Sequence, residues 1–267
     1  MAEPTSPAVV LDPTDTRVPT VIVDDAHIVY RIYGSGGGPS SPLASFKRLV
    51  TRTKSAQIRE VHAIKGISFV AYRGEAVGLV GSNGSGKSTL LRAIAGLLPA
   101  ERGSIYAAGQ PSLLGVNAAL MNELPGERNV ALGCLAMGMS PGEVREKTQS
   151  IIDFSGINER GDFSSLPMKT YSSGMAARLR FAIAAAKKHD VLLIDEALAT
   201  GDAKFRRRSE ERVRELRAEA GTVFLVSHSE ASIRSTCERS IWLESGVIRA
   251  DGPTEDVLKE YESYMRK

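Results

Sequence analysis

The octapeptide Gly81 to Ser88 (GSNGSGKS) matches the pattern G-x-x-x-x-G-K-[ST]. The apolar run 76–80 (AVGLV) before it predicts a strand, and 88–97 after it predicts a helix. In that setting glycines let backbone N–H groups turn inward around phosphate, and the helix N-terminus adds its dipole. The pattern predicts a phosphate-binding loop made by Gly81, Ser82, Asn83, Gly84, Ser85, Gly86, Lys87, Ser88 and Thr89.

Three side chains of this loop have separate expected tasks. Lys87 should reach the β- and γ-phosphates of a nucleotide, Ser88 should ligate Mg²⁺, and Thr89 should support the α-phosphate side. The alternative is a glycine turn followed by a lysine by chance. That alternative does not explain why a predicted strand precedes the motif and a predicted helix follows it.

A second chemical group stands at the end of the apolar run 191–194 (VLLI). Asp195 fits an aspartate that holds Mg²⁺ through water, and Glu196 is placed to polarise an attacking water. Two carboxylates at a strand end are common by chance. Downstream of a phosphate loop they predict a nucleoside triphosphate hydrolase.

The segment 171–175 (YSSGM) narrows the class further, because it stands just before a predicted helix. Serine and glycine at a helix N-terminus form an anion site. Here the sequence resembles the ABC (ATP-binding cassette) ATPases, whose signature is usually LSGGQ. Ser172 and Gly174 take the matching positions, while Ser173 and Met175 replace glycine and glutamine. The resemblance implies that this site binds the γ-phosphate of ATP held by a second subunit, and hence a homodimer.

Two further positions follow the family's order. Asp202, in 199–202 (ATGD), stands at the D-loop position, and His228, after the apolar strand 223–226, stands at the switch-histidine position. The resemblance implies that His228 contacts the γ-phosphate. It covers residues of about 20–255.

The sequence departs from the family at two places. The glutamine that the family has between the phosphate loop and the signature is missing from 111–130. Asn117 is the nearest amide, and it either coordinates Mg²⁺ or water in place of the glutamine or is a turn residue. The aromatic residue that stacks on adenine fits Tyr30 best, with Tyr33 as the alternative, and either could instead pack on a sheet.

These motifs predict an α/β fold with a P-loop (RecA-like) core, an antiparallel β subdomain and an inserted helical subdomain, as in ABC ATPases. We expect a disordered tail over 1–18, the cassette over 19–255 with its helical subdomain at about 111–176, and a short C-terminal helix over 256–267 without a carbohydrate-binding domain. Ser140, Pro141 and Glu143 predict the start of a helix that ends at Gly156.

The particular branch is indicated by YSSGM, by the glutamine-free segment 113–129, by 195–202 (DEALATGD) and by the basic stretch 45–54 (SFKRLVTRTK). Together they look like the ATPases that export lipid-linked polysaccharides of the O-antigen, teichoic acid or galactan type. The resemblance implies two copies of an integral-membrane permease, a lipid-linked glycan substrate and a peripheral place on the cytoplasmic face of the membrane. The alternative is an ABC importer or exporter for another small or lipid substrate.

Composition adds exclusions of its own. The net charge of +3 gives no reason to expect nucleic acid as a partner, and no apolar run reaches the ~20 residues of a transmembrane helix. Cys134 and Cys237 are far apart in sequence and fit no redox or zinc spacing, and two lone cysteines favour a reducing compartment.

Overall fold

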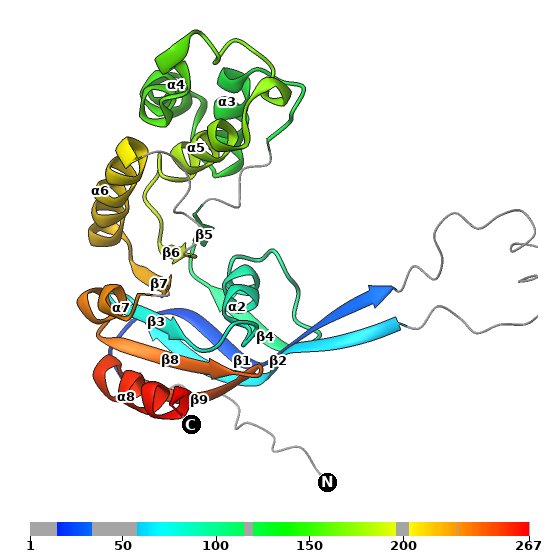
Figure 1. Ribbon diagram of the computed structural model, residues 1–267, viewed down its shortest axis with the longest axis vertical. Helices are drawn as coiled ribbons and strands as arrows, with labels where there is room; N and C mark the ends of the chain where they lie inside the picture. Colours follow the sequence, from blue (N-terminus) through cyan, green and yellow to red (C-terminus); the bar gives the residue numbers. More distant parts are fainter. Residues whose placement is uncertain (1–14, 34–57, 115–119, 196–202, 228, 267) are drawn as a thin grey trace, which may run out of the picture.

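The computed structural model describes residues 15–33, 58–114, 120–195, 203–227 and 229–266, which form two β-sheets and a set of helices (Figure 1). The strands are β1 (Pro19–Tyr33), β2 (Ile58–Tyr72), β3 (Ala76–Val80), β4 (Arg102–Ala107), β5 (Ser112–Leu113), β6 (Val191–Ile194), β7 (Thr222–Val226), β8 (Arg239–Glu244) and β9 (Val247–Pro253). The α-helices are α2 (Lys87–Ile94), α3 (Gly126–Ala136), α4 (Pro141–Ser155), α5 (Ser173–Ala184), α6 (Ala203–Glu219), α7 (Glu230–Thr236) and α8 (Thr254–Met265). Two 3₁₀ helices, η1 (Ile157–Arg160) and η2 (Met168–Thr170), connect α4 to α5.

The smaller sheet is antiparallel, with strand order β2-β1-β4. In the sequence, the apolar stretch 21–23 and the alternating stretch 27–33 each predict a strand. The structure joins these two strands into β1. The register shifts where Asp24 and Asp25 stand, and Asp25 adopts a positive φ of 44°. A bulge therefore absorbs the two aspartates without ending the strand.

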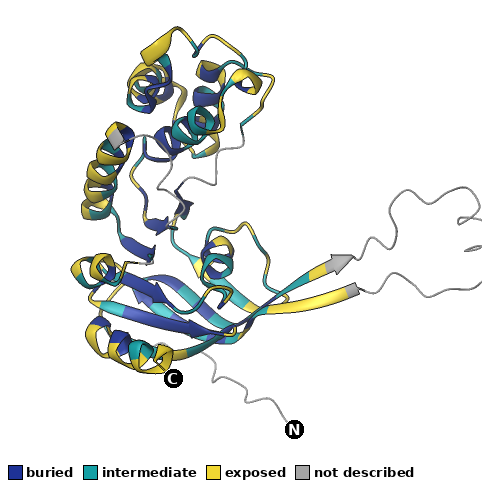
Figure 2. Cartoon of the chain, in the orientation of Figure 1, coloured by how far each residue is buried: buried dark blue, intermediate teal, exposed yellow. Residues whose placement is uncertain are grey.

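The larger sheet has the order β5-β6-β7-β3-β8-β9, with every neighbouring pair parallel except β8 and β9. All residues of β6 and β7 are buried, as expected for strands covered on both faces. Phe69 of β2 and Phe224 of β7 lie with ring centroids 6.1 Å apart, within a cluster of apolar residues that both sheets and α2 share. The phosphate loop thus follows directly on the buried strand β3 of the larger sheet (Figure 2).

Helices α3, α4 and α5 pack around a separate apolar cluster that includes Val130, Ile151 and Leu179. The predicted start of α4 is confirmed. Ser140 accepts a hydrogen bond from the Glu143 N–H at 3.3 Å, and the Glu143 carboxylate accepts one from the Ser140 N–H at 2.8 Å. Gly156 ends the helix in the left-handed conformation.

The chain ends are held against the sheets where they are described. Of the segment expected to be a disordered tail, residues 1–14 lie outside the described residues, whereas Arg17 pairs with Glu75 at 3.1 Å and stacks on the Tyr72 ring. The predicted C-terminal helix is α8, whose Tyr261 and Tyr264 contact Trp242 of β8. Among the described helices, none combines the length and the apolar character that a membrane crossing needs.

Candidate functional site

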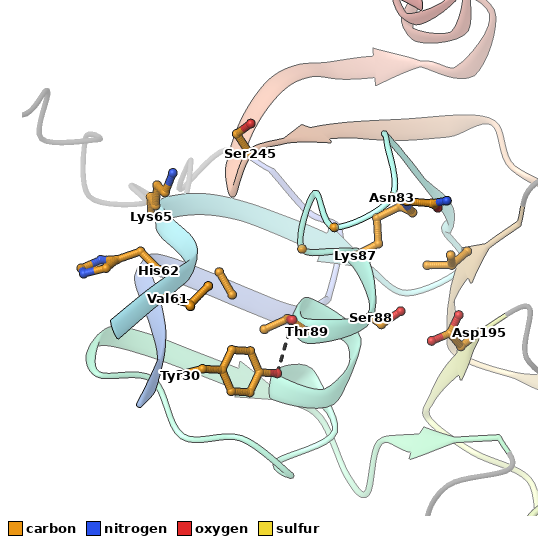
Figure 3. Close-up of a pocket in the computed structure, with 14 residues that line it drawn as sticks. Tyr30, Val61, His62, Lys65, Asn83, Lys87, Ser88, Thr89, Asp195 and Ser245 are labelled. Carbon is orange, nitrogen blue, oxygen red and sulfur yellow. Dashed lines mark hydrogen bonds between the residues drawn. The ribbon is translucent and has the colours of Figure 1, made fainter. Parts of the chain in front are cut away.

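The predicted phosphate loop joins β3 to α2 (Figure 3). Gly86 is the N-cap residue of α2 and provides no side-chain hydrogen bond to the helix, and no acidic residue stands in the first turn. The N–H groups at the start of α2 are therefore not capped by the N-cap side chain, and no carboxylate in that turn opposes an anion. This is the arrangement that binds phosphate at a helix N-terminus.

Lys87 lies across the loop. Its Nζ donates to the carbonyl oxygens of Gly81 at 2.7 Å and Ser82 at 2.8 Å, with the Ser85 hydroxyl at 3.4 Å. Both carbonyls belong to the loop itself, so the ammonium charge is already in place beside the N-terminus of α2. An incoming phosphate would meet a cation and a helix dipole of the same favourable sign.

A cleft of about 530 Å³ opens beside the loop. It is lined by residues of the loop, of β1 and β2, and of the central strands, namely Tyr30, Val61, His62, Ala63, Lys65, Asn83, Gly84, Gly86, Lys87, Ser88, Thr89, Asp195, Val226 and Ser245. In Figure 3 the Ser88 hydroxyl points toward the Asp195 carboxylate. The two side chains predicted to hold Mg²⁺ from distant parts of the sequence thus line one cleft, and both offer the oxygen ligands that Mg²⁺ prefers.

Tyr30 lies at the other end of the cleft, on β1. Its hydroxyl is 3.4 Å from the Thr89 hydroxyl, which connects the wall of the cleft to the first turn of α2. Val61 of β2 is the register partner of Tyr30 and is 39% exposed. The side chain of Tyr33, the alternative to Tyr30, lies outside the described part of the chain.

Sequence reasoning missed Val61 and Lys65 as cleft residues. The available signal was the antiparallel pairing of β1 and β2, which places Val61 beside Tyr30. The segment 34–57 separates the two strands in sequence, so the register could not be counted from the residues alone.

The signature residues stand apart from this cleft. Ser172 is the N-cap of α5, where its hydroxyl accepts from the Met175 N–H at 3.2 Å. Ser172 and Ser173 are exposed and Gly174 is half-buried, and none of the three lines the cleft. Figure 1 places α5 among the upper helices, away from α2. The N-termini of α2 and α5, which the sequence predicts as two phosphate-binding ends, therefore stand apart in the described chain.

Tyr171 anchors the signature segment to the helical group. Its hydroxyl donates to the Phe163 carbonyl oxygen at 2.6 Å, and burial raises the pKa of this phenol. Glu196, Asp202, His228 and Asn117 lie outside the described residues, so their predicted roles stay predictions.

The fold and this loop place the chain among the P-loop proteins built as ATP-binding cassettes. The ABC transporter family model matches residues 64–199, and the chain belongs to that family. Proteins of the family bind ATP, typically with Mg²⁺.

Relatives with curated names were also found. The chain is 40% identical over 205 residues to a teichoic acids export ATP-binding protein, TagH, of Enterococcus faecalis, a match covering 77% of this chain and 45% of that protein. It is 39% identical to TagH of Staphylococcus saprophyticus, over 76% of each chain. Across the first relatives that it matches, the chain spans about half to two thirds of their length.

Solved structures agree on the fold. The ATP-binding cassette MJ0796, in a dimeric post-hydrolysis state bound to ADP and Pi, aligns with a TM-score of 0.64 and 20% identity, covering 88% of this chain and 98% of that one. An ATP-binding subunit of an ABC transporter aligns with a TM-score of 0.65 and 23% identity, covering 91% and 93%. At these identities the likeness establishes the fold.

Proposed function

We propose that this chain binds and hydrolyses ATP as the cassette of an ABC transporter that exports a lipid-linked polysaccharide. The observation that carries the ATP part is the cleft in which Lys87, Ser88 and Asp195 meet beside the N-terminus of α2. A cation, a helix dipole and two oxygen ligands are what a magnesium-bound triphosphate requires.

In this proposal the loop Gly81 to Ser88 surrounds the phosphates, and Lys87 leaves the loop carbonyls to neutralise the β- and γ-phosphates. Ser88 and Asp195 would hold Mg²⁺, which supplies charge neutralisation on the phosphate oxygens when bound. Tyr30 and Val61 form an apolar wall on which adenine would pack. Glu196 would position the water that attacks the γ-phosphate, and His228 would contact that phosphate.

The separated signature supports a homodimer. Ser172, Ser173 and Gly174 stand at an exposed helix N-terminus that does not line the cleft of their own chain. A second copy would bring this end to the γ-phosphate, and Asp202 would lie between the two copies. The cassette MJ0796, which shares the fold, is described as dimeric in a state bound to ADP and Pi.

The transported substrate is inferred from the relatives. Several are named for the export of teichoic acids, at 38–40% identity over 77–80% of this chain. We propose a lipid-linked glycan as the substrate, two copies of a membrane permease as partners, and a peripheral position on the cytoplasmic face of the membrane. These names favour polysaccharide export over another small or lipid substrate.

The test is reconstitution in liposomes. The chain is combined with its permease and a fluorescent lipid-linked glycan, and both ATP hydrolysis and movement of the glycan between leaflets are measured. Both should require ATP and Mg²⁺, and Lys87→Ala should abolish both. ATP hydrolysis without glycan movement, together with transport of an unrelated lipid, would replace the proposed substrate. Failure of the wild-type chain to bind ATP would overturn the proposal at its base.

A further inference from the structure

Behind the phosphate loop lies a buried carboxylate that the motifs do not include. Glu244 ends β8 and is 7% exposed. Its Oε1 accepts from the Ser82 hydroxyl at 2.6 Å, and its Oε2 accepts a longer bond from the Ser82 N–H at 3.4 Å. Both oxygens of the carboxylate thus engage one residue of the loop, although 162 positions separate them in sequence.

The turn that follows Glu244 holds the loop at a second point. The Gly246 N–H donates to the Ser85 carbonyl oxygen at 3.0 Å. At a third point, Gly81 packs so closely on this hairpin that a Cβ there would come within 1.9 Å of the Leu243 carbonyl oxygen. The β8–β9 hairpin is therefore fitted against the loop at its first, second and fifth residues.

Ser82 connects this buttress to the phosphate-binding lysine. Its hydroxyl donates to Glu244, while its own carbonyl oxygen accepts from Lys87 Nζ at 2.8 Å. Neither Ser82 nor Glu244 lines the cleft, so the carboxylate contacts the loop from outside the phosphate site. A shift of Ser82 would displace a partner of Lys87 and the backbone that leads to Gly84 and Gly86.

The hydrogen bonds to Glu244 favour the ionised form of its carboxylate. Burial opposes its ionisation, yet donation by the Ser82 hydroxyl and N–H, with the nearby charge of Lys87, keeps the pKa of Glu244 below its usual value. An ionised carboxylate is an acceptor at both oxygens, and hydrogen bonds to a charged group are stronger than neutral ones.

We propose that Glu244 is a positioning residue for nucleotide binding, which fixes the phosphate loop through Ser82 before the phosphates arrive. This inference rests on the proposed binding of ATP. Glu244 would order the phosphate loop before the nucleotide binds. Its loss should therefore lower the affinity for the nucleotide and raise KM, and should change kcat much less.

The experiment compares Glu244→Ala, Glu244→Gln, Ser82→Ala and the double variant Ser82→Ala/Glu244→Ala. Equilibrium binding of a fluorescent ATP analogue with Mg²⁺ is measured at a temperature where each variant is fully folded. Glu244→Ala and Ser82→Ala should each weaken binding about tenfold, the scale of one hydrogen bond to a charged group. The double variant should bind ATP no more weakly than Glu244→Ala, because removal of Glu244 already eliminates the contact that the Ser82 hydroxyl makes.

Glu244→Gln should bind within about threefold of the wild type, because its amide oxygen can still accept from the Ser82 hydroxyl. Glu219→Ala, which removes an exposed carboxylate at the end of α6 that pairs with Lys188, is the matched control and should bind as the wild type does. Michaelis constants measured on the same variants should rise with the dissociation constants while kcat stays within about twofold.

Three outcomes would overturn the inference. The first is wild-type affinity in both Glu244→Ala and Ser82→Ala. The second is additive losses in the double variant. The third is tighter binding by Glu244→Gln, which would mean that the carboxylate acts by repelling phosphate. Should Glu244→Ala fail to fold, Ser82→Ala and Glu244→Gln decide the question. Lys87→Ala separates this result from the larger proposal, since binding that is indifferent to Lys87 would refute the ATP site itself.

Discussion

The close fit of Gly81 against the β8–β9 hairpin allows a sharp stability prediction for Gly81→Ala. The φ of Gly81 is 142°, where L side chains rarely lie, and the new Cβ would stand 1.9 Å from the Leu243 carbonyl oxygen and 2.8 Å from Ser85 Oγ. The first neighbour is backbone, so the hairpin and the loop must separate. The disfavoured conformation costs about 1–3 kcal/mol.

Separation also weakens the bonds from Ser82 to Glu244 and from Gly246 to Ser85, at about 1–3 kcal/mol in sum. We expect the free energy of unfolding to fall by about 4 kcal/mol. For a chain of this size each kcal/mol lowers the melting temperature by about 2–4 °C, so the decrease should be about 10 °C.

Gly74→Ala is the matched control. Gly74 has a φ of 90°, and nothing lies within 4 Å of the position its Cβ would take, so conformational strain alone should apply. That strain is about 1–2 kcal/mol. Thermal unfolding without nucleotide, followed by circular dichroism, measures both variants. Equal melting temperatures for Gly81→Ala and Gly74→Ala would refute the reasoning, because the hairpin contact would then carry no cost.

Three more predictions concern the site and the pH. Glu196→Gln should retain ATP binding while ATP hydrolysis falls about 10²-fold, the scale of one positioned acid–base group, and near-normal turnover in a phosphate-release assay would transfer the role to another residue. Tyr30→Ala should weaken ATP binding by about tenfold through lost stacking, whereas Tyr30→Phe should change it little because the Thr89 contact is long, and a titration in which both variants bind as the wild type would exclude Tyr30. His189 is buried, which lowers its pKa, so unfolding takes up a proton below the ordinary value of 6.5. Stability should therefore fall as the pH drops from 7 to 5, and urea unfolding should show a shallower fall in His189→Gln.

Local signals predicted the elements that depend on near neighbours in sequence. The capping box at Ser140 and Glu143 fixed the start of α4, and Gly156 its end. The apolar runs at 191–194 and 223–226 lie in β6 and β7, as predicted. A short continuous apolar run is typical of a strand that is buried on both faces, and all residues of these two strands are buried.

Features that depend on packing between residues far apart in sequence were not predicted from the sequence. The stretches 21–23 and 27–33 predict two strands, whereas pairing with both β2 and β4 carries β1 across Asp24 and Asp25 through a bulge. No sequence motif includes Glu244, and its burial follows from the parallel pairing of β8 with β3, which brings the end of β8 to the phosphate loop. The motifs predicted that Lys87, Ser88 and Asp195 act on one nucleotide, and the structure places all three around one cleft.

The pairing of β1 has a mechanical consequence for the cleft. Strand β4 pairs with β1 from Val21 to His27, and from Ile28 onward the described pairing of β1 is with β2 alone, forming the exposed arm at the right of Figure 2. A two-stranded ribbon bends more easily than a sheet covered on both faces. Tyr30 and Val61 are register partners within that ribbon, whereas Lys87 and Ser88 begin α2, which packs on the buried core. The Tyr30 end of the cleft should therefore deform more easily than the Lys87 end. A ligand that contacts both ends would restrict the bending of the two-stranded ribbon.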